Sequence, residues 1–342
     1  MSPVTAGAPP GRMARLLLGL AVLCVGACAE TRDLGTTVPR GKLPVDARNP
    51  FVLMNDGVHD NWQGEYALLM ANGGGMTLAG IIVNTGGNSP DIDANVTGWR
   101  ALVTAARYSG MQSPDPIASI GPSLTRPADS QFASTTPNHS EGAHLILEAS
   151  RLSLPYRPLV VVTGGRLTDL ADAYLIDHTV AQRVVVVASL GSLTSSGAVM
   201  NAPNGEMDPW ADAIVAASYR FVQVSAFYDQ LTDVPASQLG ELPSNAFGAW
   251  MTMKQPDIWS LPQAADQVGV LALGVPSFAA TVQSVSVGPL PDGGSAGPDL
   301  MVKQGGPDWL VTQVDSGEST RLFWRLLKDP ATYGGAHADA GP

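Results

Sequence analysis

The chain has 342 residues, of which 45% are hydrophobic and only 14% are charged, and its formal net charge is −11. The apolar content is too high, and the charge too sparse, for a disordered chain. The acidic balance argues against a nucleic-acid partner, because such binding needs clustered Lys and Arg. Both cysteines, Cys24 and Cys28, lie near the start, so the remainder is not a disulfide-stapled module.

The first 27 residues have the pattern of a bacterial export signal. Two arginines precede an apolar run over residues 16–25, which is too short to span a bilayer. The run ends in V-G-A-C, which resembles the lipobox of bacterial lipoproteins, with Cys28 as the lipidated residue. We expect a signal peptide over residues 1–27 and a protein of the cell envelope, anchored to the membrane on its periplasmic or extracellular face. A soluble secreted protein is the alternative.

Residues 28–49 are polar, contain two prolines and lack periodicity, which predicts a tether. We expect one folded domain over residues 50–328 and a flexible tail over residues 329–342. The predicted strands are 51–54, 78–83, 159–162, 183–188, 221–224 and 279–287. The predicted helices are 63–72, 91–108, 140–152, 168–176, 209–218 and 264–273, with a Gly/Pro loop over 288–299.

The valine-rich runs at 159–162 and 183–188 are continuous rather than alternating, which is typical of parallel strands covered on both faces. Because strands alternate with helices along the chain, the sequence predicts an α/β fold with a doubly wound, mostly parallel sheet. Ligands of such sheets bind beyond the carboxyl ends of the strands.

Polar segments follow three of the predicted strands, at residues 55–65, 84–88 and 163–169. Their carboxylates, amides and carbonyls form the oxygen-rich set that a hard cation such as Ca²⁺ prefers. Each segment alone is also ordinary turn and helix-cap sequence. The three together favour a ligand site at one edge of the sheet.

In this order, the segments resemble the inosine-uridine type nucleoside hydrolase family. Gly87-Asn88 matches the family's T-x-x-G-N-like turn, and residues 159–175 resemble its G-P-L-T-N-L-A segment. Asn204 lies four residues before Asp208, as in the family's E-F-N-x-x-x-D-P pattern, and Asp266 precedes an apolar helix as in H-D-x-L-A-V. The resemblance covers about residues 50–328 and implies a nucleoside hydrolase-like fold.

The family's opening motif, D-x-D-P-G-x-D-D, can be aligned in two registers. One places Asp56 on the catalytic base and Asp60 and Asn61 on the paired acids, with Met54 replacing the opening Asp. The other places Asp60 and Glu65 on the base and the second ligand. The sequence alone does not choose between them.

The resemblance implies a calcium-dependent hydrolase of N-glycosidic bonds in nucleosides or related ribosides. Its Ca²⁺ would be held by Asp56, Asp60, Asn61, the Thr168 carbonyl and Asp266. Asp56 would also take a proton from the attacking water, and Asn88 and Asn204 would bind the ribose. A small-molecule nucleoside or riboside is therefore the expected partner, and self-association into a homo-oligomer stays open.

Two departures from the family put activity in doubt. Ala202 stands where the family carries Glu, and Ala265 stands where many members carry the His that protonates the leaving base. Asn61 also removes one negative charge from the calcium site, which should weaken binding. A nucleoside- or sugar-binding lipoprotein without catalysis is the alternative. The signature loops of serine hydrolases, P-loop NTPases and dinucleotide enzymes do not follow a predicted strand.

Several single residues have a functional and a structural interpretation. His59 or His139 could supply a replacement acid, and Trp62 or Trp259 could stack on a base, although such residues are more often exposed and packed, respectively. Asp208 is expected to cap the helix that begins at Pro209. Glu141 and His144 are three apart on a helix but have no third metal ligand nearby.

Overall fold

The computed structural model separates the chain into two units, Met1–Thr37 and Val38–Pro342. The structure describes part of the second unit, residues 43–334, with these gaps: 59–61, 87–88, 189–190, 194–197, 202–206, 226–233, 259–269, 271–278 and 290–299. The predicted helix 264–273 and the loop 288–299 thus lie almost wholly outside the described residues. Cys28 and the predicted signal peptide also lie outside the described residues.

The described strands form one mixed sheet in the order β3-β2-β1-β4-β5-β8-β11-β9-β10-β7-β6. Their bounds are β1 Pro50–Asn55, β2 Thr77–Val83, β3 Pro116–Ala118, β4 Leu159–Thr163, β5 Val184–Ala188, β6 Gly191–Leu193, β7 Ala198–Asn201, β8 Arg220–Val224, β9 Ala279–Pro289, β10 Leu300–Gln304 and β11 Asp308–Val314. From β3 to β11 every neighbouring pair is parallel, whereas β9, β10, β7 and β6 pair antiparallel. The predicted α/β class with a mostly parallel sheet is confirmed.

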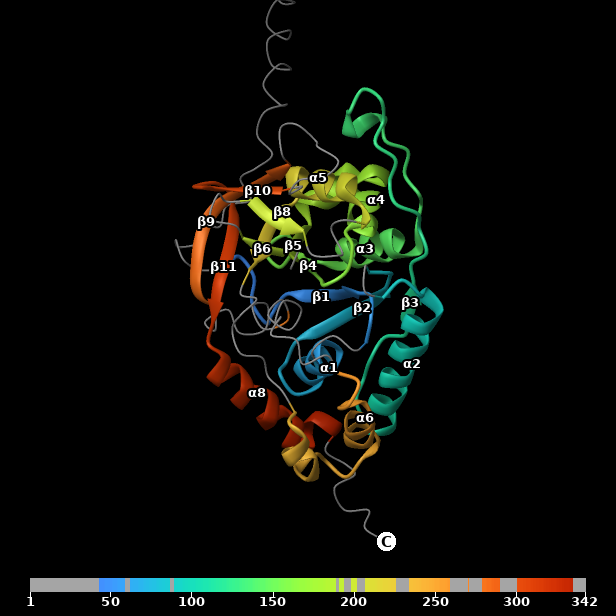
Figure 1. Ribbon diagram of the computed structural model, residues 1–342, viewed down its shortest axis with the longest axis vertical. Coiled ribbons are helices and arrows are strands. Elements are labelled where there is room, and N and C mark those ends of the chain that lie inside the picture. Colours follow the sequence, from blue (N-terminus) through green and yellow to red (C-terminus); the bar gives the residue numbers. More distant parts are fainter. Residues whose placement is uncertain are drawn as a thin grey trace, which may run out of the picture. The chain divides into compact units, whose positions relative to one another are not determined.

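Helices cover both faces of the parallel part (Figure 1). Their bounds are α1 Gln63–Asn72, α2 Ile92–Tyr108, α3 Glu141–Leu152, α4 Thr168–Ile176, α5 Pro209–Ser218, α6 Ala246–Lys254 and α8 Ser316–Lys328. Short 3₁₀ segments occupy Phe132–Ser134, His178–Gln182, Ala236–Glu241 and Pro330–Tyr333. Helices α1, α2, α6 and α8 lie on one face, and α3, α4 and α5 lie on the other.

The valine-rich strands explain this layering. In β5, Val185 and Val187 belong to the hydrophobic cluster on the α1 side, whereas Val184 and Val186 belong to the cluster on the α3 side. Successive side chains of a strand point to opposite faces, so a strand that is buried on both faces must be apolar throughout. The run is fully buried, as this arrangement requires.

The antiparallel part of the sheet was not fully anticipated. Strand β9 corresponds to the predicted strand 279–287, but β10, β11 and the helix α8 that follows them were not predicted. Asp308 joins the two parts of the sheet, because its carboxylate accepts hydrogen bonds from Phe221 N of β8 at 3.2 Å and Val287 N of β9 at 3.0 Å. A buried carboxylate is an unusual strand residue, which hid β11 from a reading of apolar runs.

The folded region extends beyond the boundaries expected at both ends. Leu43 and Val45 are buried in the core on the α1 side, although they were assigned to the tether. Residues 330–333, assigned to the flexible tail, form a 3₁₀ turn whose Thr332 is buried. Among the described helices, none combines the length and the hydrophobicity needed to cross a bilayer.

A substitution in the buried part of β1 tests this architecture. Leu53 is fully buried between β2 and β4, and Leu53→Ala should lower the free energy of unfolding by about 2–5 kcal/mol because it leaves a cavity. Urea denaturation measures the change. Leu152→Ala, which makes the same deletion at an exposed residue, should shift the value by less than about 0.5 kcal/mol. Equal effects of the two substitutions would contradict the assigned core.

Candidate functional site

The site is built where the winding direction of the sheet reverses, between β1 and β4. Strand β1 continues to β2 on one side, whereas β4 lies on the other. In sheets of this kind the turns on the two sides of such a switch point diverge, and the crevice between them, at the carboxyl ends of the strands, is where ligands bind. Asp56 follows β1 directly and is buried. Its Oδ1 accepts from Gly57 N at 2.7 Å and its carbonyl accepts from Trp99 Nε1 at 3.0 Å, which fix its orientation.

Asn84, the first residue after β2, connects three segments. Its N–H donates to the Asn55 carbonyl at 2.9 Å, and its Nδ2 donates to the Arg166 carbonyl at 3.1 Å. Its own carbonyl accepts from Asn95 Nδ2 at 3.0 Å. The side chain is fully buried, and Oδ1 has no hydrogen-bond partner. A buried amide oxygen without a partner costs about 1–3 kcal/mol.

The turn after β4 leaves room for this amide because residue 165 is glycine. A Cβ at Gly165 would lie 2.3 Å from Asn84 Oδ1, so any other residue at this position would force the amide to move. The next residue, Arg166, is also buried, and its Nη2 donates to the Gly121 carbonyl at 2.7 Å while Nε has no partner. Hydrogen bonds therefore orient the buried polar side chains of Asn84 and Arg166 at this end of the strands.

Thr168 begins α4 and is connected to the start of α5. Its hydroxyl donates to Asp208 Oδ2 at 2.7 Å, and the same oxygen accepts from Leu124 N at 2.9 Å. The other oxygen of Asp208 accepts from Ala211 N at 3.1 Å, so the predicted helix cap is confirmed. Burial raises the pKa of Asp208, and the hydrogen bond from Thr168 partly offsets that effect.

Two further carboxylates, Asp169 and Asp172, lie on the buried side of α4. Asp169 accepts from the hydroxyls of Ser119 and Ser140, the latter at 2.8 Å. Asp172 accepts from the backbone N–H groups of residues 138–140, the shortest at 2.7 Å. Burial raises the pKa of Asp169, whereas the two serine hydroxyls and the charge of Arg166 lower it. These acids hold the segment before α3 against α4 and so support the crevice.

Glu65 does not face the crevice as a free carboxylate. It is fully buried on α1, and its Oε1 accepts from Trp250 Nε1 of α6 at 2.8 Å, while Oε2 has no partner. Burial raises the pKa of Glu65 to about 7. In the second register Glu65 would be a metal ligand and Asp60 the base. Because α6 binds one oxygen of Glu65, we carry forward as a proposal the register in which Asp56 is the base.

The structure describes two of the predicted site residues, Asp56 and Thr168, and both lie at carboxyl ends of neighbouring parallel strands. Asn88, Asn204, Asp60, Asn61 and Asp266 lie outside the described residues, as do His59 and Trp259. Within the described residues, no three His, Cys, Asp or Glu side chains are grouped closely enough to hold a metal. The polar segments 84–88 and 163–169 already contained Asn84 and Asp169, although neither was given a role of its own. Sequence reasoning missed Asp172, for which the T-D-L-A-D pattern was the signal.

The remaining single-residue hypotheses have structural outcomes. Trp62 is buried in the core, so it is packed and does not offer a stacking surface. His139 and His144 stack with their ring centroids 6.1 Å apart. Glu141 and His144 are exposed, which leaves no support for a metal pair there.

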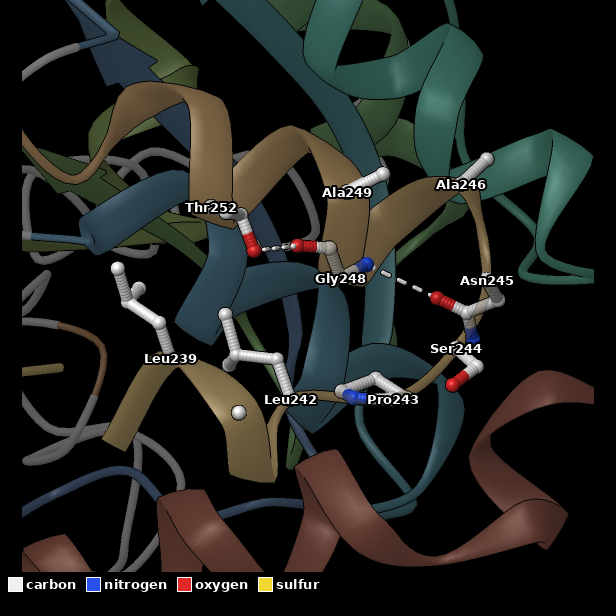
Figure 2. Close-up of a pocket in the computed structure, with 10 residues that line it drawn as sticks. Leu239, Leu242, Pro243, Ser244, Asn245, Ala246, Gly248, Ala249 and Thr252 are labelled. Atoms are coloured by element: carbon white, nitrogen blue, oxygen red, sulfur yellow. Dashed lines mark hydrogen bonds between the residues drawn. The ribbon is translucent and has the colours of Figure 1, made fainter. Parts of the chain in front are cut away.

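A shallow hollow of 470 Å³ lies between Ala236–Glu241 and α6 (Figure 2). Its polar groups serve the helix itself: Gly248 N donates to Asn245 Oδ1 at 2.9 Å, and Thr252 Oγ1 donates to the Gly248 carbonyl at 2.9 Å. None of the predicted site residues lines it. The hollow is therefore separate from the crevice at the strand ends.

No family model matches the sequence, and no curated protein matches it. Solved structures do match. The inosine-uridine preferring nucleoside hydrolase from Bacillus anthracis has a TM-score of 0.59 at 15% identity, over 82% of this chain and 99% of that chain. The fold is that of the nucleoside hydrolases. A purine-preferring ribonucleoside hydrolase from Gardnerella vaginalis has a TM-score of 0.61 at 16% identity, and a plant nucleoside hydrolase has 0.55 at 15%, each over 82% and 99% of the two chains.

The cap of α5 should be more important for this nucleoside hydrolase-like fold than an ordinary helix cap. Asp208→Ala removes the acceptor of three hydrogen bonds in a buried position and should cost about 3 kcal/mol of unfolding free energy. Asp91→Ala, at the exposed cap of α2, should cost about 1 kcal/mol. Urea denaturation of both variants measures the difference. A cost at Asp208 no larger than that at Asp91 would refute the bridging role.

Glu65 should make stability depend on pH. Its folded pKa of about 7 lies above the ordinary value of 4.5, so the folded state binds the proton more tightly and the free energy of unfolding falls as pH rises between these values. The full loss is about 3 kcal/mol. Glu65→Gln keeps the acceptor for Trp250 and removes the titration, so its stability relative to wild type should rise across this pH range.

The measurement is urea denaturation from pH 4.5 to pH 8, with Glu148→Gln on the exposed side of α3 as the matched control. The difference between each variant and wild type removes the contributions of all other titrating groups. A Glu65→Gln difference that stays constant with pH would show that the carboxyl is not buried as described.

Proposed function

We propose that this protein hydrolyses the N-glycosidic bond of nucleosides or related ribosides in the crevice between β1 and β4. The likeness to nucleoside hydrolase structures over most of the chain supports hydrolysis of this bond. The observation that carries the proposal is the position of two buried groups at the ends of neighbouring strands: Asp56 after β1, and Asn84, with its unpartnered Oδ1, after β2. Such crevices are where α/β sheets bind their ligands.

Cleavage of this bond develops positive charge on the ribose and negative charge on the leaving base. Asp56 is the group proposed to take a proton from the attacking water, since it is held at the strand end by Gly57 N and Trp99. Asn88 and Asn204 are the groups proposed to bind the ribose hydroxyls. The amide oxygen of Asn84 adds a hydrogen-bond acceptor at the same edge of the sheet.

Ca²⁺ is the proposed cofactor. The donors that the structure describes at this edge are oxygens, including a buried carboxylate at Asp56 and the orphaned amide oxygen of Asn84, and such donors fit a hard cation. Asp56, Asp60, Asn61, the Thr168 carbonyl and Asp266 would hold it. When bound, the ion would gather the ribose hydroxyls and lower the pKa of a coordinated water.

The departing base has no assigned proton donor. Ala265 and Ala202 stand where the resembled family carries His and Glu. Without a general acid, the rate should fall by about 10² to 10⁴, so substrates with good leaving groups are favoured. These two alanines also favour the second candidate function, capture of a nucleoside or sugar without catalysis. In both cases we propose that Cys28 is lipidated and that the protein acts in the cell envelope.

The decisive assay incubates the purified protein with a nucleoside panel and Ca²⁺ and follows the free base and ribose. Asp56→Asn should lower the rate by about 10² to 10⁴, and removal of Ca²⁺ by a chelator should have a comparable effect. Asp257→Asn, at an exposed carboxylate three residues after the end of α6, is the control and should leave the rate unchanged.

Calorimetry separates the two candidate functions. If the folded wild-type protein binds a nucleoside but releases no base, hydrolysis is excluded and the binding function is favoured. Neither binding nor release of base from any nucleoside, in a protein that still binds Ca²⁺, would exclude both.

A further inference from the structure

An exposed apolar turn, here called the tip, lies at the amino-terminal ends of the strands, opposite the ends at which Asp56 lies. Between α3 and β4 the chain makes a tight turn, in which Arg157 N donates to the Leu154 carbonyl at 2.8 Å. The turn exposes three large apolar side chains: Leu152 is 82% exposed, Leu154 47% and Tyr156 70%. With Pro155 at its second position the turn is conformationally restricted, so these side chains cannot easily fold back onto the protein.

Arginines surround this tip. The Arg157 guanidinium lies over the Tyr156 ring, 5.8 Å from its centroid. The Arg151 side chain is 62% exposed, with Nη2 3.8 Å from Asp177 Oδ2. Arg183 and Arg48 lie nearby, as do three acids: Asp177 pairs with Arg183 at 3.0 Å, Asp46 pairs with Arg48, and Glu148 is exposed on α3. In a chain of net charge −11, this surface is not negative. Arginines can contact the lipid headgroups while Leu and Tyr side chains enter the boundary between headgroups and acyl chains.

The chain enters its fold beside the same tip. Asn49 Nδ2 donates to the Pro158 carbonyl at 2.8 Å, and the charge of Arg157 contributes to lowering the pKa of Asp46, after the larger effect of its hydrogen bond with Arg48. Residues 28–42 connect this point to Cys28 and can extend to at most about 50 Å. A lipid on Cys28 would keep this point of the chain within about 50 Å of the membrane, which raises the effective concentration of the tip at the bilayer.

We propose that Leu152, Leu154 and Tyr156, with Arg48, Arg151 and Arg157 around them, form a surface that docks on the lipid bilayer. This membrane-docking tip precedes β4, whereas Asp56 and Thr168 follow the carboxyl ends of parallel strands. Docking thus turns the crevice away from the lipid and toward the aqueous side. The inference does not depend on what the crevice binds or cleaves.

The experiment measures contact between the tip and lipid in the full, processed chain reconstituted in vesicles of phosphatidylcholine with a minority of phosphatidylglycerol. Tyr156→Cys is labelled with an environment-sensitive fluorophore and quenched by a spin-labelled lipid. The matched control is Ile120→Cys, because Ile120 is 75% exposed but follows the carboxyl end of β3. Quenching at position 156 should exceed that at position 120 several-fold.

Leu152→Ser combined with Leu154→Ser should lower the ratio of docked to undocked protein about tenfold or more, because each change removes apolar area from the bilayer contact. Both side chains are exposed, so circular dichroism should report an unchanged fold. Equal quenching at positions 156 and 120, or no effect of the serine variant, would overturn the proposal. A concentration-dependent dimer in light scattering that the serine variant abolishes would also overturn it, in favour of a second copy as the occupant.

A second arrangement removes the dependence on Cys28. The chain from residue 29 carries an N-terminal histidine tag and is held on the same vesicles by a nickel-chelating lipid; the tag precedes the unit that begins at Val38. Docking in this arrangement supports the tip even if Cys28 carries no lipid. Absence of preferential quenching at position 156 here overturns the proposal, whatever the outcome of the nucleoside assay.

Discussion

The structure depends on the in-register pairing of β1 with β4. Met54 pairs with Thr163, so the two strands end at the same level, and Gly164 N then donates to the Met54 carbonyl at 3.1 Å. Asn84 N repeats this connection from β2 to the carbonyl of Asn55. Three turns that are far apart in the chain therefore begin from one level, and each can present its first polar residue to the same crevice. A shift of one residue in either pairing would turn those side chains to the opposite faces of the sheet.

Around this crevice the protein buries carboxylates that it does not neutralise with an equal number of cations. Asp169, Asp172 and Asp208 are instead satisfied by hydroxyl and backbone N–H donors, with Arg166 as a buried positive charge near them. Burial of a carboxylate is tolerable only with such donors. Most of the donors come from the segment before α3, and Asp208 itself caps α5, so these carboxylates fix the positions of two helix starts. The same hydrogen bonds that offset the cost of burying these carboxylates therefore also order the starts of α3 and α5.

Much of this was readable from local sequence. The continuous valine runs identified the central parallel strands, and Asp before Pro209 identified the cap of α5. Strand β3 was missed because it has three residues and begins with proline, and α8 was missed although Asp315 and its apolar spacing mark an amphipathic helix. Asp56 could be placed at a strand end from sequence. The orphaned oxygen of Asn84 could not, because its environment is made by Gly165, which is remote in the chain.

The ends of the sheet have a consequence for how copies of the protein behave beside one another. In the described part of the chain, both outermost strands are short: β3 spans Pro116–Ala118 and β6 spans Gly191–Leu193. An outermost strand exposes unpaired backbone groups on which another sheet can grow, and shortness or proline limits that growth. Proteins confined to a plane meet at high local density. Under the proposed membrane anchoring, short outermost strands would limit polymerisation of neighbouring copies through their backbones.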